Sequence, residues 1–146
     1  MLSLRWSLDP LLPREAVGGF PVLVRDSAIP TGAAESGSAS FSGPNPRTVV
    51  GIGAEGRRAL LVVIDGRRPG VSAGLTLQQT ADLLRALGAR DGPNLDGGGS
   101  SALVVESARE GAAPRVVTRP SDPTGERPVG NALAVLARCG DHGTRR

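Results

Sequence analysis

The sequence predicts an α+β domain in which a mixed β-sheet of about six strands is combined with one main helix. Short apolar, β-branched runs recur along the chain, and stretches rich in Gly, Pro and Ser separate them, which is typical of strands joined by loops. One segment, residues 77–87, has the apolar spacing of an amphipathic helix. The chain has 146 residues, of which 39% are hydrophobic, so it is long and apolar enough to fold as one domain.

The elements that precede the helix are predicted to be strands. The apolar run 20–24 (FPVLV) predicts a first strand. Residues 27–46 are rich in Ser, Gly, Ala and Pro and are expected to form a long loop, of a kind that is often functional. Residues 47–53 and 59–66 are apolar and β-branched on either side of the turn AEGRR, which predicts a β-hairpin. The run LVVI at 61–64 indicates a strand that is buried on both faces.

The helix over 77–87 carries signals for both of its ends. Thr76 and Gln79 have the spacing of a capping box, in which each side chain bonds the backbone N–H of the other residue. Gly88 follows the last apolar position and supplies the left-handed conformation that ends many helices.

Three further strands are predicted after the helix. Residues 102–107 (ALVVES) and 114–119 (PRVVTR) form a pair of short apolar runs joined by a small polar turn region. A Pro-rich loop follows, and residues 131–137 (NALAVLA) are expected to form the last strand. The domain is expected to span 16–138, between a poorly ordered lead-in at 1–15 and a polar tail at 139–146.

Composition argues against several classes of protein. The net charge is +3 and all 17 basic residues are arginine, but the arginines are scattered and no aromatic residues lie between them, so no nucleic-acid partner is expected. A single cysteine, Cys139, excludes an intramolecular disulfide and lies near His142 in the polar tail. No apolar run has the length of a membrane span, and the sequence as given carries no export signal, so it does not indicate a location.

One polar cluster follows the second strand of the predicted hairpin, and another lies in the segment after the helix. Loops at strand ends commonly converge on ligands. In IDGRRPG, Asp65 and Arg67 leave an apolar strand; a turn aspartate with solvated arginines is the alternative interpretation. In NLDGGGSS, Asn94 and Asp96 alternate around one residue, so both side chains are expected on one face. The glycines that follow would let backbone N–H groups approach an anion, although a flexible linker explains them too.

A third cluster lies in the segment RPSDPTGERPVGN. Arg119, Asp122, Arg127 and Asn131 occur in one predicted loop, where ordinary turn chemistry is the alternative. None of the clusters matches a dinucleotide-binding loop, a P-loop or the nucleophile elbow of a serine hydrolase. Two carboxylates suit glycosyl chemistry and arginines suit phosphate, so a sugar joined through a phosphodiester would use both sets.

The quoted motifs together resemble the phosphodiester glycosidases. The runs RTVVGIG, VVIDGRRPG, GLTLQQTADLLRALGARDGPNLDGGGSSALVV and RPSDPTGERPVGNALAV carry the resemblance, which covers about residues 16–138. It implies that family's fold and the hydrolysis of a sugar-1-phosphodiester, with an N-acetylglucosamine-type sugar, to free sugar and a phosphomonoester. A context in exopolysaccharide or cell-envelope glycan metabolism is implied as well.

The resemblance also implies roles for individual residues. Asp65 and Asp96 are expected to be the acid/base or nucleophile pair, and Arg47 and Arg127 are expected to hold the phosphate. The expected substrate-binding residues are Arg47, Arg67, Asn94, Gly97, Gly98, Gly99, Ser100, Arg127 and Asn131. No cofactor or metal is expected, because no ligand-loop spacing supports a Ca²⁺ site among the aspartates.

One departure from the family concerns length. Family domains are longer at the N-terminus, so this chain is expected to lack N-terminal strands, and unpaired strand edges would favour self-association. The alternative function is therefore a non-catalytic module that binds a phosphorylated glycan or another anion. Family members are commonly secreted or associated with the cell envelope, and their partner is a small-molecule or glycan substrate carrying a phosphodiester.

Overall fold

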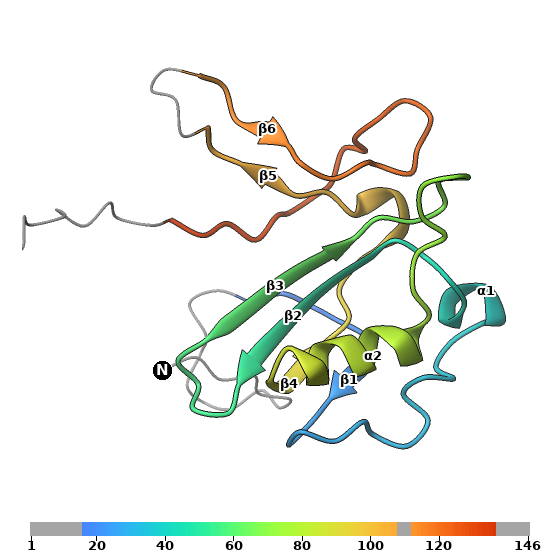
Figure 1. Cartoon of the computed structure of the whole chain (residues 1–146), viewed down its shortest axis with the longest axis vertical. Coiled ribbons are helices and arrows are strands. Elements are labelled where there is room, and N and C mark those ends of the chain that lie inside the picture. Colours follow the sequence, from blue (N-terminus) through green and yellow to red (C-terminus); the bar gives the residue numbers. More distant parts are fainter. Residues whose placement is uncertain (1–15, 108–111, 137–146) are drawn as a thin grey trace, which may run out of the picture.

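The computed structural model in Figure 1 describes residues 16–107 and 112–136 of the chain. Its elements in chain order are β1 (Val22–Val24), α1 (Ala39–Ser42), β2 (Arg47–Gly53), β3 (Ala59–Ile64), α2 (Leu77–Ala86), β4 (Ala89–Pro93), the 3₁₀ turn η1 (Gly98–Ser100), β5 (Val104–Val105) and β6 (Arg115–Val116). The expected α+β class, with one main helix, is confirmed.

The strands form two antiparallel sheets. The larger sheet has the order β1-β4-β2-β3, and β5 pairs with β6 in a separate two-stranded sheet. The predicted hairpin is confirmed as β2–β3, which is paired from Arg47 opposite Ile64 to Ile52 opposite Ala59. Strand direction corrects the expectation of a mixed sheet, because every pairing among the described strands is antiparallel.

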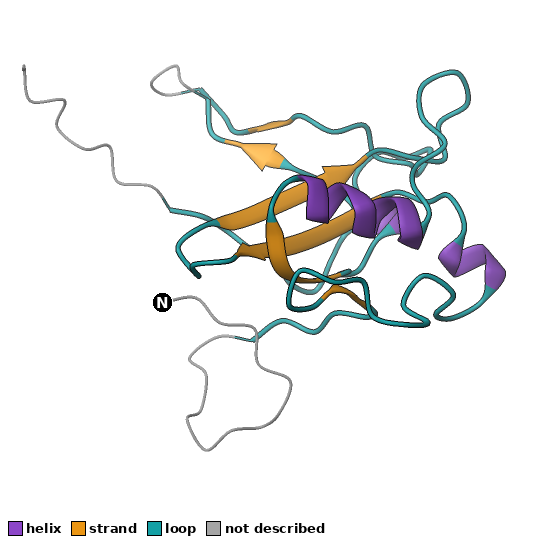
Figure 2. Ribbon diagram, turned by 60° about the horizontal axis from the view of Figure 1, so that its bottom comes forward, coloured by secondary structure: helices purple, strands orange, loops and turns teal. Residues whose placement is uncertain are grey.

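Helix α2 covers one face of the larger sheet, as Figure 2 shows. The predicted capping box is present: the Thr76 hydroxyl accepts from the N–H of Gln79, and the Gln79 side chain accepts from the N–H of Thr76. The apolar face of the helix meets β1, β2 and β4 in the core. That core consists of Leu23, Val24, Val49, Leu77, Ala81, Leu84 and Ala89.

Strand β4 was not predicted, and its sequence explains why. ARDGP contains no β-branched or aromatic residue, and Gly and Pro are depleted in strands. The small residues are needed because β4 lies between two strands and beneath α2. A Cβ at Gly92 would lie 2.7 Å from the carbonyl oxygen of Val50 and 3.1 Å from a methyl group of Leu84.

Two other strand predictions are wrong. Strand β3 is not buried on both faces: Leu60 and Val62 pack against the core, whereas Leu61, on the opposite face, is 40% exposed. β3 is also an edge strand, which pairs only with β2 in the described structure. β2 is the strand buried along nearly all of its length. Residues 131–136 form no strand and are exposed, because no described strand pairs with them; residue 137 lies outside the described part of the chain.

The predicted lead-in, the polar tail with Cys139 and His142, and the last residues of the expected domain lie outside the described residues. Within the two described ranges, no helix has the length and apolar character needed to cross a lipid bilayer. In the same ranges, no group of three acidic, His or Cys side chains is arranged to hold a metal ion.

Candidate active site

A cavity of about 310 Å³ lies between the start of β2, the loop that carries α1 and the glycine turn at 97–99. It is lined by Ser40, Phe41, Asn45, Pro46, Arg47, Arg67, Asn94, Asp96, Gly97, Gly98, Gly99 and Arg127. Four of these residues come from the loop at 27–46, which sequence analysis treated only as a long and often functional type of segment.

Arg47, the first residue of β2, is a buried cation with neutral partners. Its side chain is 2% exposed. Its Nε donates to the carbonyl oxygen of Leu75 at 3.1 Å, and one terminal nitrogen donates to those of Phe41 and Gly43, each at 2.7 Å. The guanidinium carbon also lies 5.5 Å from the centre of the Phe41 ring. Burial, and then the nearby charge of Arg67, lower the pKa of Arg47.

Arg67 follows β3 and faces the same cavity. It adopts a positive φ of 52°, which turns the chain back after the strand. Its Nε and one terminal nitrogen donate to the side-chain oxygen of Asn45 at 2.9 and 2.5 Å. Among the described residues, no carboxylate pairs with Arg47 or Arg67. Both arginines therefore keep an unneutralised positive charge at the cavity.

Asn45 was missed by sequence analysis. It lies between two prolines in GPNP, a pattern that is typical of a turn and gives no sign of a role in a site. In the structure it is 5% exposed, and its Nδ2 donates to the carbonyl oxygens of Ser40, Phe41 and Gly43 at 2.7, 3.3 and 3.1 Å. Its contacts with residues far along the chain cannot be read from local sequence.

In the glycine turn, fewer backbone N–H groups are free to bind an anion than expected. The N–H of Gly97 donates to the carboxylate of Asp96 at 2.9 Å, and the N–H of Gly98 donates to the carbonyl oxygen of Pro46 at 3.0 Å. Two of the N–H groups expected to meet an anion are thus bonded within the protein. Gly98 has a φ of 62°, in the left-handed region that favours glycine.

Asn94 and Asp96 both line the cavity, but in different environments. Asp96 is exposed. Asn94 is 2% exposed, and its Nδ2 donates to the carbonyl oxygens of Phe20 and Leu95, both at 2.9 Å. The side-chain oxygen of Asn94 has no hydrogen-bond partner. A buried acceptor without a partner is uncommon, and this one belongs to a residue that lines the cavity.

Arg127 reaches the cavity with its charge already paired. Its guanidinium donates to both carboxylate oxygens of Asp122, at 2.9 and 3.2 Å. The pair lies directly against Gly99, where an added Cβ would overlap both side chains. The expected cluster at 119–131 therefore contributes one ion pair to the site. The side chain of Arg127 is 49% exposed, so water also screens this pair.

Three predicted site residues are not among those that line the cavity. Asp65 is half-buried, and one of its carboxylate oxygens accepts from the backbone N–H of Arg119 at 2.9 Å. Ser100 forms the end of the 3₁₀ turn, and Asn131 is exposed in the C-terminal segment. The structure thus brings together the predicted residues Arg47, Arg67, Asn94, Asp96, Gly97, Gly98, Gly99 and Arg127.

Comparisons with known proteins point to one family. A sequence model described as phosphodiester glycosidase matches residues 7–136. No curated protein sequence matches the chain significantly. Several solved structures match the chain.

The zebrafish N-acetylglucosamine-1-phosphodiester alpha-N-acetylglucosaminidase catalytic domain, auto-inhibited by its pro-peptide, is 26% identical with a TM-score of 0.54, over 71% of this chain and 34% of that one. A Burkholderia pseudomallei K96243 protein named "putative exported protein" is 45% identical with a TM-score of 0.50, over 57% of this chain and 14% of that one. A hypothetical protein from Synechocystis is 30% identical with a TM-score of 0.48, over 58% of this chain and 16% of that one. The chain thus spans only 14% to 34% of the length of these structures.

Proposed function

The chain belongs to the phosphodiester glycosidase family, and from this premise we propose that it hydrolyses a sugar-1-phosphodiester. In this reaction the bond between the anomeric carbon and the phosphate oxygen breaks. The hydroxyl of water goes to the sugar, and its proton goes to the phosphate, which leaves as a phosphomonoester. The family is one of glycosidases; the activity of this chain, its sugar and its biological context are parts of the proposal.

The observation that carries the proposal is the presence of Asp96 in one cavity with Arg47 and Arg67. A carboxylate is needed for acid, base or nucleophilic chemistry at an anomeric carbon. Unneutralised arginines suit the phosphate, because their planar forks bind its oxygens in pairs and stabilise the charge that develops on the leaving group. Within the protein, the exposed Asp96 carboxylate accepts only one hydrogen bond, from the N–H of Gly97.

We assign different roles to the two expected carboxylates. Asp96 is the reacting group in this proposal. Asp65 does not line the cavity, and its bond to the N–H of Arg119 supports a positioning role, since it anchors the segment that carries Asp122 and Arg127. Arg47 and Arg67 would hold the phosphate and Asn94 would accept from a sugar donor.

The named relatives support a narrower substrate and a location. The zebrafish enzyme is named for an N-acetylglucosamine-1-phosphodiester, which supports an N-acetylglucosamine-type sugar here. The name of the Burkholderia pseudomallei protein supports export. We therefore propose action on exopolysaccharide or cell-envelope glycans, outside the cytoplasm.

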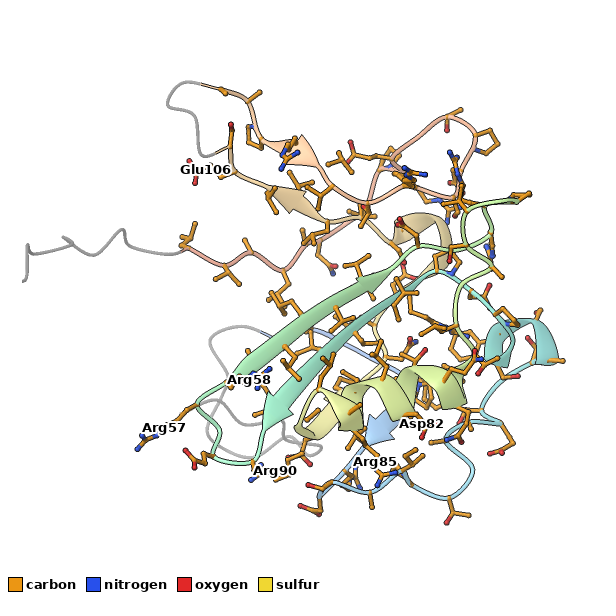
Figure 3. The ribbon with its side chains drawn as sticks, in the orientation of Figure 1. Arg57, Arg58, Asp82, Arg85, Arg90 and Glu106 are labelled. Carbon is orange, nitrogen blue, oxygen red and sulfur yellow. The ribbon has the colours of Figure 1, made fainter. Side chains whose placement is uncertain are left out.

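The experiment that tests the proposal measures free N-acetylglucosamine released from N-acetylglucosamine 1-(p-nitrophenyl phosphate) by the purified chain. We expect Asp96→Asn to abolish release while circular dichroism shows an unchanged fold, because the variant keeps the shape of the side chain and loses its proton transfer. Asp82→Asn is the matched control, since Asp82 lies on α2 and not at the cavity (Figure 3). Unchanged turnover in Asp96→Asn would contradict the assignment.

A non-catalytic binding module is the second candidate, and one observation favours it. Asp96 is the one carboxylate among the described lining residues, whereas glycoside hydrolysis ordinarily uses two. Saturable binding of a phosphorylated glycan without release of sugar, weakened by Arg67→Ala, would support this candidate over the enzyme.

A further inference from the structure

We propose that Asn45 is a positioning residue that organises Arg47 and Arg67 into one phosphate-binding site, and that its neutral side chain keeps this site cationic. The identity of the ligand rests on the proposed function. The test, however, measures the binding of inorganic phosphate and does not require turnover.

The amide of Asn45 connects the two arginines physically. Its oxygen accepts both bonds from Arg67, at 2.9 and 2.5 Å. Its nitrogen donates to the carbonyl oxygens of Phe41 and Gly43, and the same two oxygens accept from Arg47 at 2.7 Å. Loss of this one amide would release Arg67 directly and would loosen the carbonyl groups that orient Arg47.

The position of Asn45 is itself fixed by close backbone packing. Its N–H and C=O both bond to the backbone of Leu75, at 3.1 Å each. The backbones of Gly66 and Gly74 lie so close that a Cβ at Gly66 would be 2.9 Å from the carbonyl carbon of Asn45, and a Cβ at Gly74 would overlap its carbonyl group. A side chain on so constrained a backbone can hold its partners with little freedom.

The three arginines at the cavity differ in the charge of the groups that accept their hydrogen bonds. Arg47 and Arg67 are held by carbonyl and amide oxygens, which orient a guanidinium without cancelling its charge. Arg127 is held by the carboxylate of Asp122, which does cancel it. The two arginines that meet through Asn45 are therefore the ones available to an anion. An uncompensated buried cation such as Arg47 is costly, and a bound anion removes that cost.

A second, independent observation points to a ligand at this place. Asn94 lines the same cavity, and its side-chain oxygen is buried without a hydrogen-bond donor. One cavity thus combines arginines that have no anionic partner with a hydrogen-bond acceptor that has no donor. A sugar phosphate offers both, since the phosphate is an anion and the sugar carries hydroxyl groups.

The test is a phosphate titration by isothermal calorimetry on the whole chain and five variants, in buffer free of other multivalent anions. We expect saturable binding by the wild type, and at least about tenfold weaker binding by Asn45→Ala and by Arg67→Gln, since hydrogen bonds to charged groups are among the strong ones. Because Asn45 acts partly through Arg67, the double variant Asn45→Ala/Arg67→Gln should lose less affinity than the sum of the two single losses. Arg57→Gln, at the far end of the hairpin from α1, is the control and should bind as the wild type does (Figure 3).

The variant Asn45→Asp sharpens the test, because a carboxylate there would still accept from Arg67 but would cancel its charge. We expect it to lose phosphate binding. Wild-type binding by a folded Asn45→Ala or Asn45→Asp variant, or additive losses in the double variant, would overturn the proposal. If the Asn45 variants do not fold, Arg67→Gln decides, because Arg67 is exposed and binding retained in that variant would remove the site.

The outcomes also separate this inference from the proposed function. Phosphate binding with the expected variant pattern, but no sugar released from the phosphodiester, would sink the enzyme and leave the anion site intact. Sugar released by Asn45→Ala with a wild-type KM would sink the role of Asn45 and leave the enzyme.

Discussion

Gly97, Gly98 and Gly99 meet three different constraints. A Cβ at Gly97 would lie 2.8 Å from the carbonyl oxygen of Pro46, and Gly98 has a left-handed φ of 62°. Gly99 instead lies beneath the ion pair of Asp122 and Arg127. The first two glycines therefore serve the fold of the turn, and the third determines how closely a neighbouring loop approaches the cavity.

We predict that Gly99→Ala impairs the site without unfolding the protein. The new methyl group would displace the ends of two flexible side chains, and a surface ion pair contributes only ~0–1 kcal/mol to stability. Because Arg127 would then leave the cavity wall, we expect slower sugar release with a melting temperature near that of the wild type. Gly18→Ala is the control, because nothing lies within 4 Å of its Cβ position. Wild-type kinetics in Gly99→Ala would contradict a role for the pair.

The sequence predicts the charged residues of the cavity better than it predicts their hydrogen-bond partners. Arg67 and Asp96 stand out in polar clusters at strand ends, and the family resemblance adds Arg47; all three line the cavity. Asn45 does not stand out, since its importance comes from Arg67 and Leu75, which lie 22 and 30 positions further along the chain. Asp65 looked equivalent to Asp96 in sequence, yet its carboxylate bonds the backbone of Arg119 instead.

At the scale of elements, one carboxylate in β4 connects that strand to the turn after β1. Asp91 accepts from the N–H of Asp26 at 3.0 Å and from Nε of Arg90 at 2.6 Å. Burial alone would raise the pKa of Asp91. The bonds from Asp26 and Arg90, with the charges of Arg90 and Arg25, outweigh burial and lower that pKa. A carboxyl group whose pKa is lowered by folding contributes stability above its unfolded pKa of about 3.9.

We therefore predict that Asp91→Asn lowers the free energy of unfolding at pH 7 by about 1 kcal/mol. The estimate is modest because Arg90 is 39% exposed and water screens its charge. The wild-type contribution should disappear as pH falls from about 4 through the lower folded pKa, so the two proteins should converge in acid. Urea denaturation between pH 7 and pH 2 checks this, and a constant difference across that range would contradict it.

Elements with strong local patterns were predictable, and elements that depend on tertiary packing were not. Residues 77–87 and the hairpin at 47–53 and 59–66 carry clear apolar periodicity or runs, and both exist. β4 is a central strand because α2 and two neighbouring strands enclose it, although its residues are poor strand formers. Residues 131–136 have the opposite character, with a strand-like sequence but no described strand beside them.

At the scale of the whole molecule, apolar side chains remain on the surface at one sheet edge and in the C-terminal segment. Leu61 on β3 is 40% exposed, and Leu133, Val135 and Leu136 are 55%, 71% and 96% exposed. An edge strand with apolar side chains offers unpaired backbone groups to another chain. We propose that β3 associates with a second copy of the chain.

We predict that the average mass of the purified chain rises with concentration in sedimentation or light-scattering measurements. Leu61→Lys should keep the protein monomeric, because a charge on an edge strand opposes strand pairing. Val71→Lys is the matched control: Val71 is 52% exposed but lies in a loop and not on the sheet edge. A wild-type chain that stays monomeric over the whole concentration range would remove the proposal.

In the proposed reaction, the neutral acceptors around Arg47 and Arg67 bear on how the product leaves. Amide and carbonyl oxygens do not titrate, so the hydrogen-bond acceptors of these two residues stay neutral as acidity changes. The ligand is what changes. A phosphodiester carries one negative charge throughout, whereas a phosphomonoester gains a second above a pKa of about 6. Inhibition by the leaving phosphomonoester should therefore grow as the medium becomes alkaline, and a mildly acidic medium should favour turnover.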